Sequence, residues 1–196
     1  MTDKKPVQIS PDAIRSPYLD QLRNGHQYQG RSNDCGPYCT AAVIHTVKRK
    51  KVSGVELGQR MAGVKWKGIL PKIYRIRNWA TFPWGIRNML KDEHIPARWS
   101  VFQKVETLQS LLSQNVMLIV IVGRFFPSWA HYKILTAYDP NRGYGFIDSA
   151  YKTSEVHWDK AELFEKYWKN YGSQIISIYP DGLPEKKTRS DSQVEQ

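Results

Sequence analysis

The chain has 196 residues, of which 41% are hydrophobic and 12% aromatic, which suits one globular domain with a sizeable core. Its formal net charge of +11 predicts attraction to anionic partners but does not by itself indicate a function. The longest apolar run, 116–122, is too short to cross a membrane, and the N-terminus has no apolar signal-peptide core. We therefore expect a cytoplasmic location, with secretion after trimming as the alternative.

Composition divides the chain into three parts. Residues 1–15 are predicted to be a flexible leader, and 16–180 a single domain. Residues 181–196 are nearly all polar or charged, which predicts a disordered tail.

The domain is expected to begin with a short strand or turn over 16–23, whose Tyr18 and Leu19 would cover the core. A polar loop over 24–33 follows, and it carries Gln29.

The sequence Asp34-Cys35-Gly36-Pro37 marks the start of a helix predicted from about Gly36 to Lys50. Asp34 is a good N-cap residue, and Pro37 is tolerated in the first turn because its missing N–H would have no partner there. Cys35 should therefore lie at or just before a helix N-terminus, where the helix dipole favours a thiolate, the reactive form of cysteine. Gln29, six residues upstream, is close enough in sequence to fold back beside it.

Cys35 and Cys39 are the only cysteines, and three interpretations compete for them. A zinc site would need more donors than His45 offers, and a disulfide across one helical turn has poor geometry. A reactive Cys35 with Cys39 as a small buried helix residue needs nothing further, and it is the interpretation that we favour.

Ser53 and Glu56 have the spacing of a capping box, so a second helix is expected with Val55, Leu57 and Met61 facing inward. The next segment, 63–81, is rich in Trp, Lys and Arg.

Within 63–81, Ile69, Ile73 and Ile76 recur at helical spacing, which predicts an amphipathic helical insertion over the core. The alternative is a wall that faces substrate or an acidic partner. The basic cluster 48–51 is interpreted as a solvated helix end, and no nucleic-acid-binding motif accompanies it.

Further elements are predicted in the order helix, strand, helix, strand. They are a helix over 83–94, a strand over 95–101, an amphipathic helix over 105–114 and a buried strand over 116–122.

A β-hairpin is predicted over 131–148, with its turn at 139–143. His131 opens the first strand and Asp148 ends the second, so an antiparallel pair brings them together at one end. A carboxylate placed in this way fixes the tautomer and orientation of a catalytic histidine. Asp139 and His157 are weaker alternatives for the acid and the base.

The C-terminal part predicts a short strand over 155–158 and a helix that ends near Asn170. Asp159 and Glu162 have the spacing of a capping box at the start of this helix. A strand over 174–179 is expected to complete the sheet.

Gln29 and the Asp34-Cys35-Gly36-Pro37 motif resemble the start of papain-like cysteine peptidases. The closer resemblance is to the branch with the leader-peptide peptidase domains of bacteriocin exporters, the double-glycine or peptidase C39-like group. It covers roughly 16–180 and is strongest at 29–47 and 131–150.

The resemblance implies an α+β fold in which an N-terminal helical part carries the nucleophile and packs on an antiparallel sheet that carries His and Asp. It implies Cys35 as nucleophile, His131 as base, Asp148 as its orienting acid and Gln29 as oxyanion donor. Relatives commonly place Pro directly after the Asp, whereas Ser149 follows here.

These residues predict thiol-dependent hydrolysis of a peptide or isopeptide bond in a peptide or protein substrate, without a cofactor or metal. Three other hypotheses are acyl transfer by the same triad, an inactive peptide-binding module of this fold, and charge-driven binding of nucleic acid. The sequence does not specify the substrate sequence or the oligomeric state.

Overall fold

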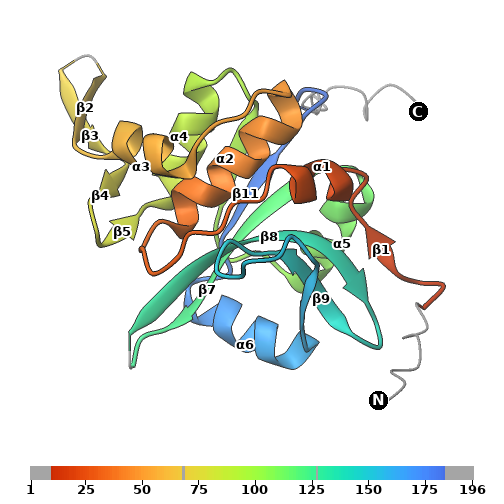
Figure 1. The fold of residues 1–196 in the computed structure, drawn as a ribbon. Coiled ribbons are helices and arrows are strands. Elements are labelled where there is room, and N and C mark those ends of the chain that lie inside the picture. The colour runs from red at the N-terminus through yellow and green to blue at the C-terminus, as the bar shows by residue number, and fades with distance from the viewer. Residues whose placement is uncertain (1–9, 68, 127, 184–196) are drawn as a thin grey trace, which may run out of the picture.

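A computed structural model describes residues 10–67, 69–126 and 128–183. At its centre is an antiparallel sheet of seven strands with helices on both faces (Figure 1). The predicted α+β fold class, with an N-terminal helical part packed on an antiparallel sheet, is confirmed. None of the described helices is both long enough and apolar enough to span a bilayer.

The N-terminal half contains β1 (Ile14–Arg15), α1 (Leu19–Asn24), α2 (Cys35–Lys48), α3 (Gly54–Met61), β2 (Val64–Lys67), β3 (Leu70–Ile73), β4 (Arg75–Ile76), β5 (Ala80–Thr81), α4 (Pro83–Asp92) and β6 (Ala97–Ser100). The C-terminal half contains α5 (Val105–Ser113), β7 (Met117–Arg124), β8 (Trp129–Asp139), β9 (Gly143–Ile147), β10 (His157–Asp159), α6 (Ala161–Asn170) and β11 (Ile175–Ile178).

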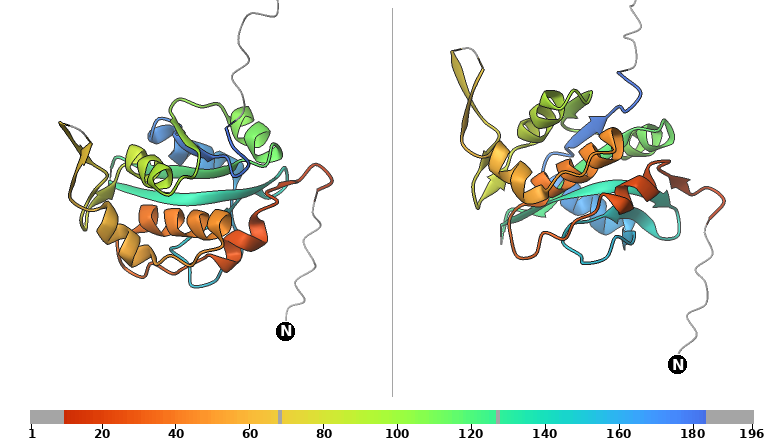
Figure 2. Two further views of the ribbon diagram at one scale, coloured as in Figure 1. Left: turned by 90° about the horizontal axis from the view of Figure 1, so that it is seen from above. Right: turned by 45° about the horizontal axis from the view of Figure 1, so that its top comes forward.

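The main sheet has the strand order β10-β9-β8-β7-β11-β6, and β1 pairs with the end of β8. The predicted strand over 174–179 is β11, which lies between β7 and β6 and leaves β6 at the edge. Two small hairpins, β2–β3 and β4–β5, lie outside this sheet. Figure 2 shows β2–β3 projecting from the body of the molecule.

The buried strand predicted over 116–122 is β7, and its side chains alternate between two hydrophobic cores. Met117, Ile119 and Ile121 pack with residues of α1 to α4 on one face of the sheet. Leu118 and Val120 pack on the other face with residues of α5 and α6. Both faces are covered, which explains why this strand is apolar at every position from Met117 to Val122.

Four local predictions are wrong. Residues 19–24 form helix α1 instead of a strand or turn, although Tyr18 and Leu19 do pack against the core. The predicted helix over 63–81 is replaced by the two hairpins. Val55 is 51% exposed instead of facing inward, while Leu57 and Met61 are buried as predicted.

The fourth error concerns α6, whose N-cap is Lys160 and not Asp159. The Asp159 carboxylate instead accepts a bond from Lys133 Nζ at 2.8 Å. By contrast, Ser53 caps α3 as predicted, since its Oγ accepts from the Glu56 N–H at 3.4 Å.

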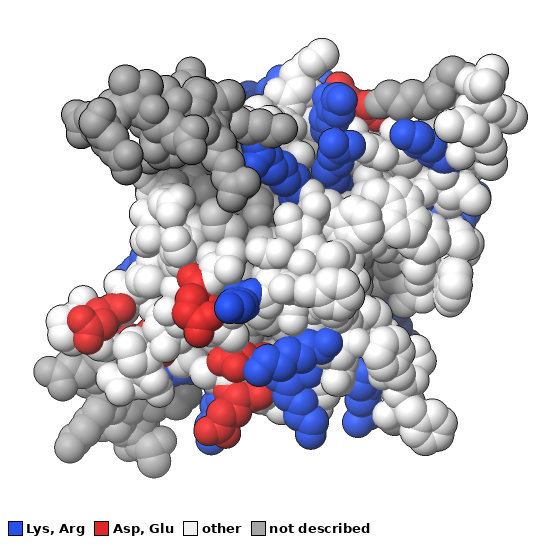
Figure 3. Space-filling view, turned by 180° about the vertical axis from the view of Figure 1, so that it is seen from behind, with Lys and Arg blue, Asp and Glu red and all other residues white. Residues whose placement is uncertain are grey.

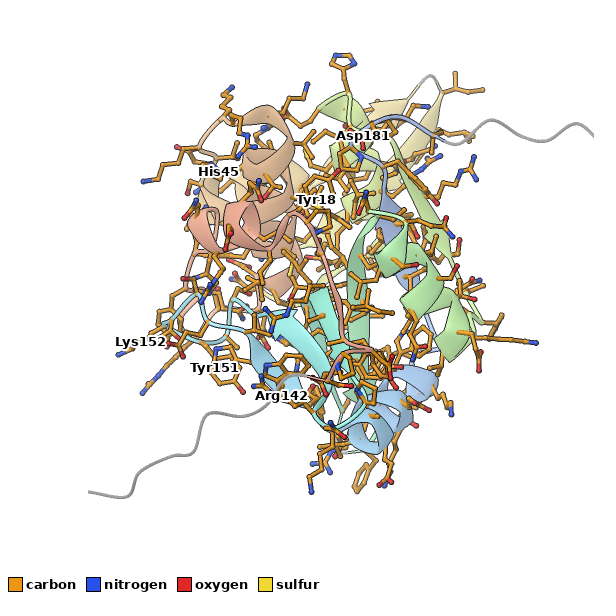
Figure 4. The ribbon with its side chains drawn as sticks, turned by 90° about the vertical axis from the view of Figure 1, so that its right-hand side faces the viewer. Tyr18, His45, Arg142, Tyr151, Lys152 and Asp181 are labelled. Atoms are coloured by element: carbon orange, nitrogen blue, oxygen red, sulfur yellow. The ribbon has the colours of Figure 1, made fainter. Side chains whose placement is uncertain are left out.

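The segment that precedes α1 lies beside the C-terminal end of the described chain. Tyr18 precedes α1, and its hydroxyl donates to the Asp181 carboxylate at 3.4 Å (Figure 4). Ile14 and Arg15, assigned to the leader, form β1. The domain limits of 16 and 180 stay predictions, because most of the leader and tail lies outside the described residues.

Candidate active site

Cys35 is the first residue of α2, as predicted, and it is 9% exposed. The first N–H groups of a helix have no intrahelical partner, and Cα–Cβ bonds tilt toward the N-terminus. The sulfur therefore lies at the positive end of the helix, which favours negative charge. Gly36 permits this placement against β5, because a Cβ atom there would lie 2.8 Å from the side chain of Thr81.

Asp34 occupies the N-cap position of α2, but its side chain does not cap the helix. Its carboxylate is instead paired with the Arg75 guanidinium, which is 4% exposed. Arg75 also donates to the carbonyl of Gly58 at 3.0 Å. The start of α2, which carries Cys35, is therefore fixed by an ion pair to β4 and through it to α3.

The β8–β9 hairpin brings His131 and Asp148 together, as predicted. The distance from His131 Nε2 to Asp148 Oδ1 is 2.6 Å, and the Asp148 side chain is 2% exposed. The carboxylate only accepts hydrogen bonds when ionised, so Nε2 carries the proton and Nδ1 is the nitrogen left for another partner.

The Cys35 thiol lies close enough to the His131 imidazole to affect its protonation. Burial lowers the pKa of His131, but the hydrogen bond to Asp148 and the interactions with Cys35 outweigh it and raise the pKa from 6.5 to about 9. His131 is therefore a cation at neutral pH, placed between a carboxylate and a thiol.

Asp148 is held in its ionised form. Burial raises its pKa, but the hydrogen bond and charge of His131, the Ala150 N–H at 2.9 Å and the Lys133 ammonium together leave the pKa below its ordinary value of 3.8. Lys133 Nζ lies 3.7 Å from Asp148 Oδ2.

The pair of His131 and Asp148 links stability to pH in a defined window. Because the pKa of His131 is raised on folding, its protonation stabilises the fold. This contribution is fully present below pH 6.5 and is lost as the pH rises through about 9. Because the pKa of Asp148 is lowered on folding, its ionised carboxylate also stabilises the fold. This contribution is present above pH 3.8 and is lost as the pH falls through the pKa of Asp148 in the folded protein. The charged pair therefore persists across the neutral range.

Gln29 is bound to the residue that follows Asp148. Its Oε1 accepts from the Ser149 hydroxyl at 2.6 Å, and its backbone N–H donates to the Ser149 carbonyl at 2.9 Å. Its Nε2 donates to the Ser32 carbonyl at 2.8 Å, which uses one of its two N–H bonds. Within the described part of the chain, no hydrogen bond joins Gln29 directly to Cys35.

The two weaker candidates lie in other surroundings. Asp139 is at the far end of the hairpin and accepts the backbone N–H groups of Asn141 and Ser10. The His157 ring stacks on Tyr151 with centroids 3.6 Å apart.

Cys39 is buried one turn beyond Cys35, at 1% exposure, and both thiols are free. Burial raises the pKa of the Cys39 thiol well above its ordinary value, and nearby Cys35 and Asp148 add to this effect. Cys39 is therefore an unreactive neighbour of the candidate nucleophile.

Three residues of the site were missed by sequence reasoning. Lys133 could have been found, because it lies two residues from His131 on one strand and so points to the same face. Ser149 and Arg75 carry no local signal, because their partners are 120 and 41 residues away.

The helical part with Cys35 and the antiparallel sheet with His131 and Asp148 give the chain a papain-like fold. One similar solved structure is a C39-like peptidase from Bacillus anthracis, with a TM-score of 0.63 and 16% identity. It covers 86% of this chain and 98% of that one.

A second similar structure is the peptidase domain of Streptococcus ComA, a bifunctional ABC transporter involved in quorum sensing, with a TM-score of 0.55 and 16% identity. It covers 79% of this chain and 96% of that domain. No family model and no curated protein matches the sequence. At these identities the likeness concerns the fold alone.

Proposed function

We propose that the protein is a cysteine peptidase that hydrolyses a peptide or isopeptide bond. The observation that carries the proposal is the position of His131, bonded to Asp148 through Nε2 and close to the Cys35 thiol. A cationic imidazole beside a thiol at a helix N-terminus favours the thiolate, which is the nucleophile in such enzymes. The papain-like fold, shared with the two peptidase structures, supports the same function.

In the first half of the reaction, the Cys35 thiolate attacks the carbonyl carbon of the scissile bond. The tetrahedral intermediate collapses when His131 Nδ1–H protonates the leaving amine, and this leaves a thioester on Cys35. Asp148 holds the ring so that Nδ1 faces the reacting atoms and stabilises the imidazolium.

In the second half, a water molecule attacks the thioester carbonyl while neutral His131 removes a proton from it. Collapse of this intermediate releases the carboxylic acid and restores the Cys35 thiolate and the His131 cation. The cycle consumes one water molecule and requires no other co-reactant.

Negative charge develops on the carbonyl oxygen in both intermediates. We assign its stabilisation to the backbone N–H of Cys35 at the start of α2 and to the Gln29 amide. The hydrogen bond from Ser149 to Gln29 Oε1 fixes which end of the amide is the donor. Gln29 thus retains one N–H for the oxyanion.

Alkylation of Cys35 tests the activated thiol and requires no peptide substrate. At about pH 6, where a free thiol is almost fully protonated, we expect iodoacetamide to modify Cys35 roughly 10-fold to 100-fold faster than glutathione. The His131→Ala variant should react at the rate of the free thiol. Mass spectrometry measures both rates, and buried Cys39 is an internal control that should stay unmodified. Equal rates for Cys35 and glutathione would contradict the proposal.

The role of Gln29 is tested by separating turnover from thiol reactivity. Gln29→Ala should lower kcat by about 100-fold to 1,000-fold, the cost of one oxyanion donor, while iodoacetamide still modifies Cys35 rapidly. Ser149→Ala removes one orienting hydrogen bond and should lower kcat by about fivefold. Ser113→Ala, at the exposed end of α5, is the matched control. If Gln29→Ala changes KM alone, Gln29 is not an oxyanion donor.

A further inference from the structure

A groove of ≈ 800 Å³ lies between β3, the start of α4 and β6. This volume is within the range of about 300–1,000 Å³ that is usual for ligand sites. Six of its residues define its chemistry, three aromatic and three cationic: Phe82, Trp84 and Trp99, and Lys72, Arg87 and Arg98. We call it the basic aromatic groove.

The aromatic residues form a preorganised apolar surface. Phe82 and Trp84 are stacked with centroids 4.5 Å apart and an interplanar angle of 5°, and Trp99 is tilted against Trp84 at 5.7 Å. The indole N–H groups of both tryptophans already donate within the protein, to the Ile73 carbonyl and to the Gln174 side chain. Each of the two tryptophans is nevertheless 39% exposed, so they offer apolar contact to a ligand.

The charge of the groove has one sign. None of its lining residues is acidic, and in the described ranges none of its three cations is in an ion pair. Figure 3 shows Lys and Arg side chains at the upper end of the molecule, the end where Figure 1 places α4, and a second group, mixed with Asp and Glu, at the lower end. A ligand with carboxylates is therefore complementary to this groove.

The strand that borders the groove is a sheet edge. β6 pairs with β11 and, in the described part of the chain, with no other strand. Successive side chains of a strand point to opposite faces, yet Arg98, Trp99 and Ser100 all line the groove, which places the groove along the free edge of β6. Such an edge presents unpaired N–H and C=O groups that can pair with an extended polypeptide.

The groove is also close to the candidate nucleophile. Phe82 follows Thr81, which packs against Gly36 beside Cys35 and accepts a hydrogen bond from the Tyr132 hydroxyl at 2.9 Å. A polypeptide bound in the groove would therefore be held near the site of bond cleavage.

We propose that the basic aromatic groove binds an acidic segment of the polypeptide substrate that also carries apolar side chains, in extended form along β6 and apart from the scissile bond. This proposal rests on the peptidase function and adds its substrate class. The free strand edge favours a polypeptide over a nucleic acid, because a nucleic acid has no backbone that matches the edge of a sheet.

The test measures binding separately from catalysis. A fluorescein-labelled peptide of about eight residues, with Glu alternating with Leu and one Trp, is titrated with the full-length Cys35→Ser protein. The Lys72→Glu/Arg98→Glu variant should weaken binding by about 10-fold or more, because it reverses two charges of the groove. Lys166→Glu, an exposed charge reversal on α6, should change affinity by less than about twofold. Trp99→Ala should also weaken binding.

Two further probes separate the alternatives. A peptide of the same sequence with alternate backbone nitrogens methylated should bind more weakly if it pairs with β6, and equal affinity would overturn the strand-edge arrangement. Failure of the acidic peptide to bind, or equal affinity for the groove and Lys166 variants, would overturn the proposal. The proposal would also be overturned if the protein bound oligo(dT) but not the acidic peptide, with an affinity that falls steeply as the salt concentration rises. Binding is measured on the Cys35→Ser protein, and peptidase activity is measured separately on the wild type. If the peptide binds but the wild type shows no peptidase activity, the result contradicts the proposed function and leaves the groove proposal standing.

Discussion

Replacing His131 with alanine is expected to lower kcat/KM for peptide hydrolysis by about 10,000-fold or more, the usual cost of losing a member of a catalytic triad. The loss has two causes, because in the proposed mechanism His131 both stabilises the Cys35 thiolate and protonates the leaving amine. Digestion of a mixed peptide library, with the products quantified by mass spectrometry, measures the effect across many candidate substrates at once. Cys35→Ala should show the same loss.

The double variant provides the control. Residues that act as one unit are not additive, so Cys35→Ala/His131→Ala should be no slower than either single variant. Thermal unfolding should confirm that all three remain folded. A His131→Ala protein within about tenfold of the wild-type rate would place the general acid elsewhere.

The pH profile gives the same prediction a second readout. Since the pKa of His131 is about 9, wild-type activity should fall as the pH rises through that value and the ring loses the proton that it gives to the leaving amine. Asp148→Asn removes the charge that supports the imidazolium, so this alkaline limb should move to lower pH. If the limb stays in place in Asp148→Asn, the carboxylate does not set the pKa of His131.

The site can be predicted from the sequence where its geometry is local. His131 and Asp148 lie on one hairpin, so the positions of its strands and turn are enough to place them together. Cys35 follows from helix-start signals within four residues. The spacing of Gln29 to Cys35 makes it a candidate, but its hydrogen bond to Ser149 has no local signal, because it depends on how a loop reaches across to the end of β9.

The predicted helix over 63–81 does not form, because the isoleucines at helical spacing do not pack against the core. Ile69 is 92% exposed, and Ile73 and Ile76 are also exposed, so no buried face stabilises a helix there. Pro71 is a signal against the helix, since proline lacks the N–H that a helix interior requires. The segment instead pairs with itself in two hairpins, one of which supplies Lys72 to the basic aromatic groove.

The capping predictions show how distant partners override local ones. Asp34 and Asp159 both have N-cap sequence signals, yet their carboxylates bind Arg75 and Lys133. The full positive charge of a guanidinium or ammonium group attracts a carboxylate more strongly than the partial charge of a backbone N–H does. A cap signal therefore locates a helix start approximately but does not determine what the side chain binds.

The ion pair of Asp34 and Arg75 should dominate the stability of α2, the helix that begins at Cys35. Replacing Arg75 with methionine is expected to lower the free energy of unfolding by about 3 kcal/mol, because it leaves a largely buried carboxylate and the Gly58 carbonyl without their partner. The Asp34 side chain is 19% exposed, so the expected loss of unfolding free energy lies at the lower end of the range for breaking a buried ion pair. Urea unfolding at neutral pH measures the change.

The matched control is Arg77→Met, an exposed neighbour whose loss should cost less than about 0.5 kcal/mol. Asp34→Asn should also destabilise the protein, because it leaves the Arg75 guanidinium without a counter-ion, and burial already lowers the pKa of that group. The double variant Arg75→Met/Asp34→Asn should recover part of the loss, since it removes both charges together. If Arg75→Met is no less stable than Arg77→Met, the ion pair does not fix α2, and the placement of Cys35 must depend on the contact between Gly36 and Thr81 instead.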